Sequence, residues 1–202
     1  MLGLRSFSLL MAFVLLPTFM GGTMLWPIQA EAHKDHAGSM TQFMKKKELL
    51  RALLPADARL VKRKETLSSA AAGWAKEMLG IDLDNKVHTY YRASDHTSGR
   101  ILGGAIIMKY AYRHGEVMLA VGIDAGQKVT AVAIQAVSEK YIPDFRTASG
   151  VGLLSGYDDK TVQDLAKIAA TAAPDKPSRF LNTKLAETAA MIAAFLHGAD
   201  NQ

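Results

Sequence analysis

Hydrophobic and polar positions alternate in three consecutive runs near the middle of the chain, at residues 100–110, 116–123 and 129–137. Alternation with a period of two, in segments rich in valine and isoleucine, is typical of β-strands. The sequence Asp124-Ala125-Gly126-Gln127 separates the last two runs and has the composition of a tight turn. The three runs therefore predict an antiparallel meander around which the rest of the chain is organised.

The middle run also predicts which side chains face the core. In its register Val121 points inward, together with Val117, Leu119 and Ile123. Gly122 then lies on the opposite face of the sheet, where the missing side chain permits a helix or a ligand to approach closely.

Helical and extended patterns flank the meander on both sides. Before it, the sequence predicts a helix from Thr41 to Leu54, a strand or extended link at 59–66, a helix at 69–79 capped by Ser68 and stopped by Gly80, and a strand at 87–92. After it come a loop at 140–157, a helix at 160–173 opened by Asp158 or Asp159, and a final helix from Asn182 or Thr183 to about residue 197. We therefore predict an α+β fold, an antiparallel sheet of four or so strands packed with N- and C-terminal helices.

The N-terminus has the pattern of an export signal. Arg5 precedes an almost wholly apolar stretch at residues 6–26, and Ala30-Glu31-Ala32 matches a small-x-small cleavage site. We expect residues 1–32 to be a cleaved signal peptide, with an uncleaved N-terminal anchor as the alternative. Residues 33–40 then form a polar linker, and 41–198 a single domain in the periplasm or an equivalent extracytoplasmic compartment.

Composition limits the chemistry of this domain. The chain contains no cysteine, so disulfides and thiolate metal sites are excluded. The net charge is +5, but its positive charges are scattered apart from Lys45-Lys46-Lys47 and Lys62-Arg63-Lys64. We interpret both runs as solvated helix faces and expect no nucleic-acid binding, because no basic stripe with interleaved aromatic residues is present.

The meander and its flanks also resemble a known family. The shared pieces, in order, are a helix and turn at 47–58, a strand ending in a basic turn with Lys109, Arg113 and His114, a strand ending Val121-Gly122-Ile123-Asp124, a further strand, and Ser138-Glu139. Together they are similar to the FMN-binding domain family, which includes flavin-carrying subunits of the sodium-pumping NADH:quinone reductase and of the Rnf complex. The resemblance spans roughly residues 45–196 and implies electron transfer with a redox or membrane protein partner.

In that family FMN is usually attached through a phosphoester to a threonine in a Gly-Ala-containing motif that leads into the last helix. Thr183 falls at the corresponding position, but Phe180-Leu181-Asn182 replaces the family's Ser-Gly-Ala. We therefore predict no covalent flavin, and interpret Thr183 as a helix-capping residue.

Non-covalent FMN remains open. The resemblance implies that Arg179 and Lys184 would serve the phosphate near the start of that helix, that a loop containing Gly150 and Gly152 would lie near the ring system, and that Glu139 would lie close to the flavin. The structural alternative is that the glycines simply form turns and that Glu139 is a solvated carboxylate at a strand end.

A metal site is the second candidate. Cleavage after Ala32 would make His33 the N-terminal residue, whose amine and imidazole can chelate Cu(II) with Asp35 and His36 nearby. Cleavage after Ala30 would place His33 third, a position that favours a square-planar Cu(II) or Ni(II) site. The alternative interpretation of His33 and His36 is a flexible polar linker.

Two functions of different classes follow. The first is an FMN-binding-like domain in an electron-transfer system, where the flavin supplies the chemistry and the protein tunes it. The second is an accessory or binding protein that has the same fold but no cofactor. It either binds a metal ion through its N-terminus or binds no metal. The loss of Gly-Ala before Thr183 favours the second.

Overall fold

The meander lies at the centre of one antiparallel sheet. A computed structural model describes residues 37–200, and places seven strands in the order β1-β6-β5-β4-β3-β2, with β7 paired to β6. The strands are β1 (Met40–Gln42), β2 (Arg59–Thr66), β3 (Val87–Ser94), β4 (Ile101–Tyr112), β5 (Gly115–Asp124), β6 (Val129–Ser138) and β7 (Gly152–Leu153). The predicted α+β class and meander are confirmed, although the sheet has more strands than expected.

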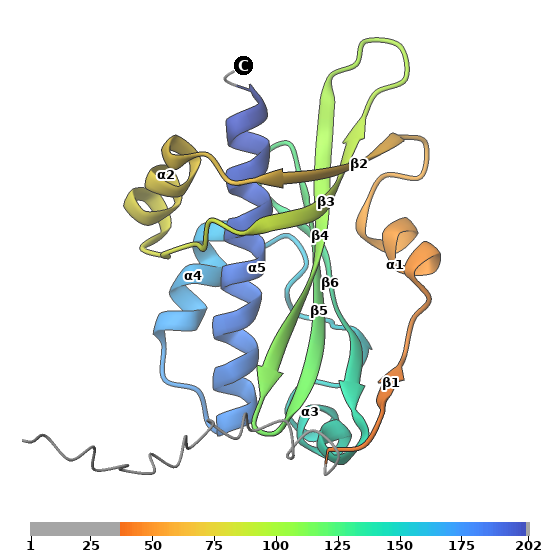
Figure 1. The fold of residues 1–202 in the computed structure, drawn as a ribbon, viewed down its shortest axis with the longest axis vertical. Helices are drawn as coiled ribbons and strands as arrows, with labels where there is room; N and C mark the ends of the chain where they lie inside the picture. Colours follow the sequence, from red (N-terminus) through yellow and green to blue (C-terminus); the bar gives the residue numbers. More distant parts are fainter. Residues whose placement is uncertain (1–36, 201–202) are drawn as a thin grey trace, which may run out of the picture. The chain divides into compact units, whose positions relative to one another are not determined.

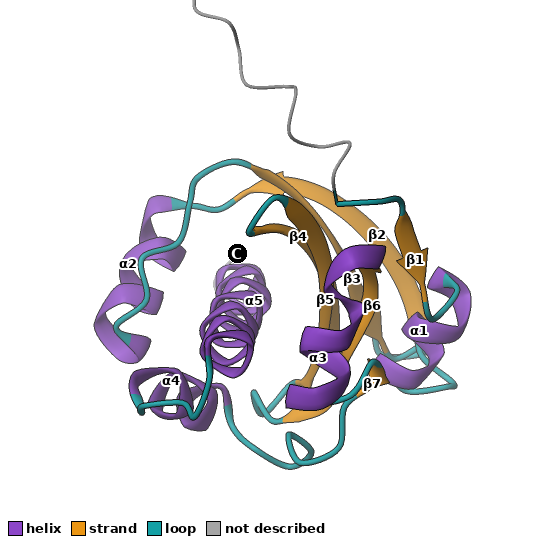
Figure 2. Ribbon diagram, turned by 90° about the horizontal axis from the view of Figure 1, so that it is seen from below, coloured by secondary structure: helices purple, strands orange, loops and turns teal. Residues whose placement is uncertain are grey.

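Helices cover both faces of the sheet. They are α1 (Lys46–Leu53), α2 (Ser69–Leu79), α3 (Ile142–Ala148), α4 (Val162–Ala170) and α5 (Lys176–Asp200), with a short 3-10 turn, η2 (Glu139–Tyr141), before α3. The sheet curves around one side of α5, and α2 and α4 lie on the other side, whereas α1 packs on the outer face (Figure 1, Figure 2). The long helix α5 is therefore enclosed by other elements over most of its length.

The alternation of the strands separates two cores. The face toward α5 carries the larger side chains of the meander, among them Leu119, Val121 and Ile134, all fully buried. The opposite face carries small residues such as Ala120 and Ala133, against which α1 packs with its buried leucines. Val121 is thus buried as predicted.

Gly122 allows α1 to approach the sheet closely. A Cβ atom built on it would lie only 2.3 Å from the carbonyl oxygen of Leu53 and 2.6 Å from Oγ1 of Thr130. The same Thr130 hydroxyl donates a hydrogen bond of 2.5 Å to the Leu53 carbonyl. The expected close approach is therefore made by a helix, and it fixes the end of α1 on β5 and β6.

The N-terminal part departs from the prediction. Residues expected to open a helix at Thr41 instead form β1, which pairs with the end of β6, and α1 begins only at Lys46 after the Lys45 N-cap. Ala37 and Ser39 accept backbone hydrogen bonds from Lys140 and Glu139. Pairing with the free edge of β6 therefore outweighs the local helix propensity of residues 40–42.

The C-terminal helices also begin elsewhere than predicted. Helix α4 starts after Thr161, whose hydroxyl and the carboxylate of Asp164 form a capping box, and not at Asp158 or Asp159. Helix α5 starts at Lys176 rather than at Asn182 or Thr183. Pro177 lies in its first turn, where the missing N–H has no intrahelical partner to lose, so this proline starts the helix instead of breaking it. The predicted loop after Glu139 contains η2 and α3.

Candidate functional site

The residues proposed for flavin attachment lie inside a helix. Thr183 is several residues past the start of α5, and its hydroxyl donates to the Arg179 carbonyl oxygen at 2.9 Å. The helix starts instead at Lys176, directly after Asp175, whose carboxylate accepts the Ser178 N–H at 2.7 Å. The interpretation of Thr183 as a helix cap is therefore wrong, and no free N–H groups surround it for a phosphate, because interior N–H groups bond to the preceding turn.

Of the two basic candidates, Lys184 is engaged elsewhere than at Thr183. Nζ of Lys184 forms an ion pair of 2.7 Å with Glu187 and lies 5.2 Å from the centre of the Tyr110 ring, beside β4. Thr183 instead lines a different groove, with residues from the end of α2 and from α4. The charge of Lys184 is already balanced by Glu187 on the same helix, and the Thr183 hydroxyl is already bonded to the Arg179 carbonyl oxygen.

Glu139 and the glycine loop have structural partners of their own. Oε1 of Glu139 accepts a hydrogen bond of 3.0 Å from the hydroxyl of Ser39, so this carboxylate ties down the segment before β1. Gly150 and Gly152 both adopt a positive φ, of 88° and 81°, and Gly152 pairs with Ile134 in β7. The chain reversal after α3 accounts for both glycines.

The histidine pair predicted to bind copper lies outside the described residues, since His33 and His36 both precede Ala37. Within residues 37–200 no group of three or more histidine, aspartate or glutamate side chains is arranged to hold a metal ion. The same part of the chain has no helix long and apolar enough to cross a membrane.

A different cluster of charged and aromatic side chains lies where β2 pairs with β3. The strand pairing sets Arg59 opposite Ser94, Val61 opposite Arg92, and Arg63 opposite Tyr90. Because side chains alternate along strands, these residues and Glu65 share one face of the sheet, the face toward α5. Tyr90 confirms this orientation, since its ring stacks on Phe195 of α5 with centroids 4.5 Å apart.

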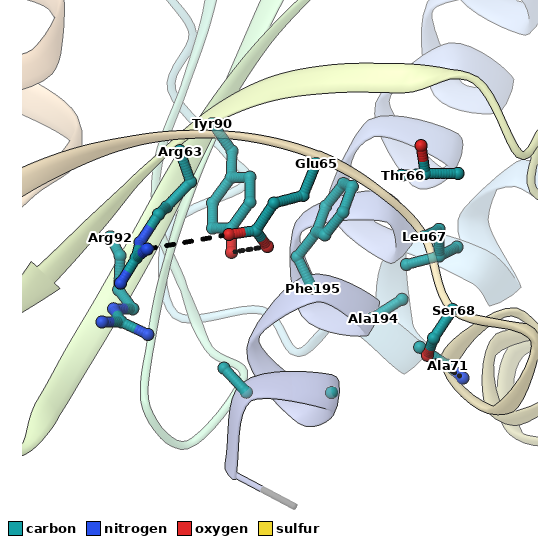
Figure 3. A pocket seen from close by; sticks show the side chains of 12 residues that line it. Arg63, Glu65, Thr66, Leu67, Ser68, Ala71, Tyr90, Arg92, Ala194 and Phe195 are labelled. Atoms are coloured by element: carbon teal, nitrogen blue, oxygen red, sulfur yellow. Dashed lines mark hydrogen bonds and ion pairs between the residues drawn. The ribbon is translucent and has the colours of Figure 1, made fainter. Parts of the chain in front are cut away.

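These side chains line a pocket of about 150 Å³ beside the last turns of α5, here called the arginine pocket (Figure 3). Its polar wall consists of Arg63, Arg92, Glu65 and Tyr90. The remaining wall is largely apolar and comes from the β2–α2 connection and from α5, including Leu67, Ala71, Ala194 and Phe195. The pocket thus has charged and polar groups on one side and apolar side chains on the other.

Glu65 is held in place by Tyr90. The Tyr90 hydroxyl donates a hydrogen bond of 2.9 Å to Oε2 of Glu65, and Nη1 of Arg63 lies 3.9 Å from Oε1 (Figure 3). Burial, followed by the neighbouring Glu65 carboxylate, raises the pKa of Tyr90 to about 12. Tyr90 is therefore a neutral hydrogen-bond donor throughout the physiological range.

The two arginines carry unused hydrogen-bond donors. Among the described residues only three buried side-chain nitrogen or oxygen atoms lack a partner, and two of them are Nε of Arg63 and Nε of Arg92. The rest of the Arg63 side chain reaches solvent, because 41% of its surface is exposed. Figure 3 shows the guanidinium groups of Arg63 and Arg92 next to each other on one side of the pocket. Two adjacent guanidinium groups on the wall of a pocket form an arrangement that can bind an anion.

A wider hollow of about 480 Å³ adjoins this pocket and shares Arg63 and Arg92 with it. Its outer wall is the β3–β4 turn, where Asp95 accepts the backbone N–H groups of Thr97 and Ser98 at 3.0 and 2.7 Å. These hydrogen bonds hold the pKa of Asp95 below its usual range. The turn is thus shaped by its own aspartate, and Arg59 completes the wall from the β2 side.

The prediction of Lys62-Arg63-Lys64 as a helix face is wrong, because these residues lie in β2, and it hid the cluster from sequence reasoning. In the strand, Arg63 faces the pocket, whereas Lys62 pairs with Tyr91 and faces the α1 side. The available signal was the period-two spacing of Arg59, Val61, Arg63 and Glu65, repeated by Tyr90, Arg92 and Ser94. A strand at 87–92 and a strand or extended link at 59–66 follow from the sequence, and alternation within both would place their charged residues on one face.

Comparisons of this chain with protein-family models, with curated proteins and with solved structures found no match.

Proposed function

We propose that this domain is an extracytoplasmic, cofactor-free binding protein that holds a small anionic ligand between Arg63 and Arg92. The observation that carries the proposal is the pair of adjacent guanidinium groups on one wall of the arginine pocket (Figure 3). The Glu65 carboxylate lies 3.9 Å from Nη1 of Arg63, beyond hydrogen-bond distance, so it balances only part of this positive charge. A carboxylate or phosphate group of a ligand would accept hydrogen bonds from the guanidinium groups and neutralise the repulsion between them.

The chemistry of the pocket favours binding over catalysis. Arginine is permanently charged in proteins, and Tyr90, with its pKa of about 12, holds its proton at neutral pH. Neither type of group exchanges a proton readily under physiological conditions, as a general acid or base would, and the remaining polar group, Glu65, accepts the Tyr90 hydroxyl through Oε2. These residues can position and recognise a ligand, which is what the proposal requires of them.

The electron-transfer function stays the alternative, with FMN as its cofactor and a redox or membrane protein as its partner. Its candidate residues Lys184 and Glu139 are each engaged by other side chains, Glu187 and Ser39. Thr183 lies within α5, away from its first N–H groups. Absorbance of the protein purified from the periplasmic fraction tests this alternative directly: a stoichiometric yellow flavin would overturn the cofactor-free proposal.

Anion binding is tested by thermal unfolding at low ionic strength with inorganic phosphate or acetate added. The parent should be stabilised by at least one of these anions, and the double variant Arg63→Gln/Arg92→Gln should lose the effect, because both pocket cations are gone. Lys62→Gln/Lys64→Gln is the matched control, since it also removes two positive charges, but from the opposite face of β2. Equal anion responses in all three proteins would reject the pocket as the site.

Export is part of the same proposal, and the segment concerned lies outside the described residues. N-terminal sequencing of the mature protein should begin at His33 and read His-Lys-Asp-His. A full-length, membrane-embedded product as the sole species would favour the anchor instead. The copper prediction for His33 and His36 is tested on the same mature protein by Cu(II) titration.

A further inference from the structure

We infer that the ligand of the arginine pocket is a small monocarboxylate that carries a hydroxyl or ammonium group beside its carboxylate. This inference rests on the proposed function, and it narrows the class of anion. Arg63 and Arg92 would take the carboxylate, and Glu65 would take the neighbouring donor. The arrangement of these three side chains around one small volume supports the assignment in four steps.

The first step is charge. Within the pocket Arg63 and Arg92 supply two positive charges and Glu65 one negative charge, which leaves +1. The adjoining hollow adds Arg59 and Asp95, which cancel each other. A ligand group with one negative charge therefore matches the site, whereas a phosphate dianion would lie next to the Glu65 carboxylate and be repelled by it.

The second step is the free acceptor capacity of Glu65. Its Oε2 accepts the Tyr90 hydroxyl at 2.9 Å, but Oε1 lies 3.9 Å from Nη1 of Arg63, beyond hydrogen-bond distance. A carboxylate can accept about four hydrogen bonds. Oε1 is thus an acceptor on the pocket wall that is open to solvent, since 45% of the Glu65 side chain is exposed, and a ligand that carries a donor would use it in place of water.

The third step is the fixed position of this acceptor. Tyr90 cannot swing away from Glu65 without losing its stacking on Phe195, where the ring planes are inclined by only 16°. The hydroxyl therefore holds the Glu65 carboxylate at a defined distance from the arginines. A preformed arrangement of this kind distinguishes ligands by geometry as well as by charge.

The fourth step is size. A cavity of about 150 Å³ corresponds to about five water molecules at ~30 Å³ each. A carboxylate, one donor-bearing carbon and a short apolar tail fill such a volume, and the tail would contact Leu67, Ala71 and Phe195. A short 2-hydroxy or 2-amino acid is therefore the class that fills the arginine pocket without extending into the adjoining hollow.

A matched pair of probes tests the inference. Lactate and propionate differ by the hydroxyl alone, and inorganic phosphate supplies the competing anion class. Binding of each is measured by NMR titration against the parent, Glu65→Gln and Arg63→Gln/Arg92→Gln, with Glu77→Gln on the exposed face of α2 as the control for loss of a carboxylate. Circular dichroism verifies that each variant is folded.

The parent should bind lactate at least about tenfold more tightly than propionate, because a hydrogen bond to a charged group is at stake. Glu65→Gln should bring the ratio of the two affinities toward one, Glu77→Gln should leave it unchanged, and the arginine double variant should bind neither acid. If the parent binds lactate and propionate equally, or phosphate best, and the double variant loses that binding, the inference is wrong while the proposed function stands. If none of the three probes binds the parent, both fail together.

Discussion

The ring of Tyr90 stacks on the ring of Phe195 with centroids 4.5 Å apart, so one aromatic pair joins α5 to the sheet and forms part of the arginine pocket. Phe195 comes from the last turns of α5, and Tyr90 from β3, more than a hundred residues earlier in the chain. The stability of this end of the helix and the shape of the pocket therefore depend on the same contact.

We expect Phe195→Ala to lower the free energy of unfolding by about 3–5 kcal/mol, the usual cost of removing a buried phenyl ring. Phe195 is only 5% exposed. Met78→Ala is the control, because Met78 lies on the surface of α2 with 55% of its area exposed and should change stability by no more than about 0.5 kcal/mol. Urea unfolding measures both, and equal midpoints for the two variants would contradict the placement of α5.

The contact between α1 and the sheet is tested by one substitution at Gly122, with the same substitution at Gly73 in α2 as the comparison. Gly122→Ala should destabilise the domain by about 1–3 kcal/mol, because the new Cβ would lie 2.3 Å from the Leu53 carbonyl oxygen and force the helix away. Gly73→Ala should instead stabilise it by about 0.5–1 kcal/mol, since Gly73 is in the interior of α2 with nothing within 4 Å of the added methyl group. Opposite signs from the same chemical change are the expected result.

The inward register of β5 is tested by a buried charge. Val121 is fully buried and pairs with Ile106 and Val132, so Val121→Asp should cost several kcal/mol, a large part of a typical stability of ~5–15 kcal/mol. Lys128→Asp, at an exposed position before β6, should change stability by about 0.5 kcal/mol or less. If Val121→Asp unfolds at the same urea concentration as the parent, the register is incorrect.

The sequence predicted those elements whose signals are local. The strands of the meander follow from alternation, and α2 was predicted correctly because the Ser68 hydroxyl caps it and Gly80 ends it in a left-handed conformation. Strand β1 could not be predicted in this way, since its conformation depends on pairing with β6, almost a hundred residues away. The start of α5 was misplaced because a proline in a first turn and a proline that breaks a helix look alike in sequence.

The candidate site was harder to predict than the fold. Residues such as Thr183 and Glu139 were chosen by position within a family pattern, and the structure gives each a local hydrogen-bond partner. Arg63 and Arg92 come from two strands whose pairing register decides that they are neighbours. The pairing register of two strands depends on tertiary packing, so the sequence alone predicts only the alternation of side chains within each strand.

Covalent flavin attachment is the next prediction, and it concerns Thr183. We expect no FMN adduct in the intact mass after co-expression with a flavin transferase, because the hydroxyl donates to the Arg179 carbonyl within an unbroken helix. Thr183→Ala should leave the mass unchanged apart from the substitution and should change stability by no more than about 0.5 kcal/mol, since Thr183 is only partly buried and alanine favours a helix. An adduct present in the parent and lost in Thr183→Ala would restore the electron-carrier function.

Alkaline pH should weaken the domain through Tyr90. Its pKa is about 12 in the folded protein, raised from 10 first by burial and then by the hydrogen bond to Glu65. Because the folded pKa is the higher one, this contribution to stability is complete below pH 10 and is lost as the pH rises from about 10 to about 12.

We expect Tyr90→Phe to be less stable than the parent at pH 8, because it lacks the hydrogen bond to Glu65. Between pH 10 and 12, however, the parent should lose more stability than Tyr90→Phe, by an amount of order 1–2 kcal/mol. Glu65→Gln should remove only part of that loss, because burial is the larger cause. Urea unfolding at several pH values compares the three proteins, and parallel curves for the parent and Tyr90→Phe would show that the hydroxyl is not buried as described.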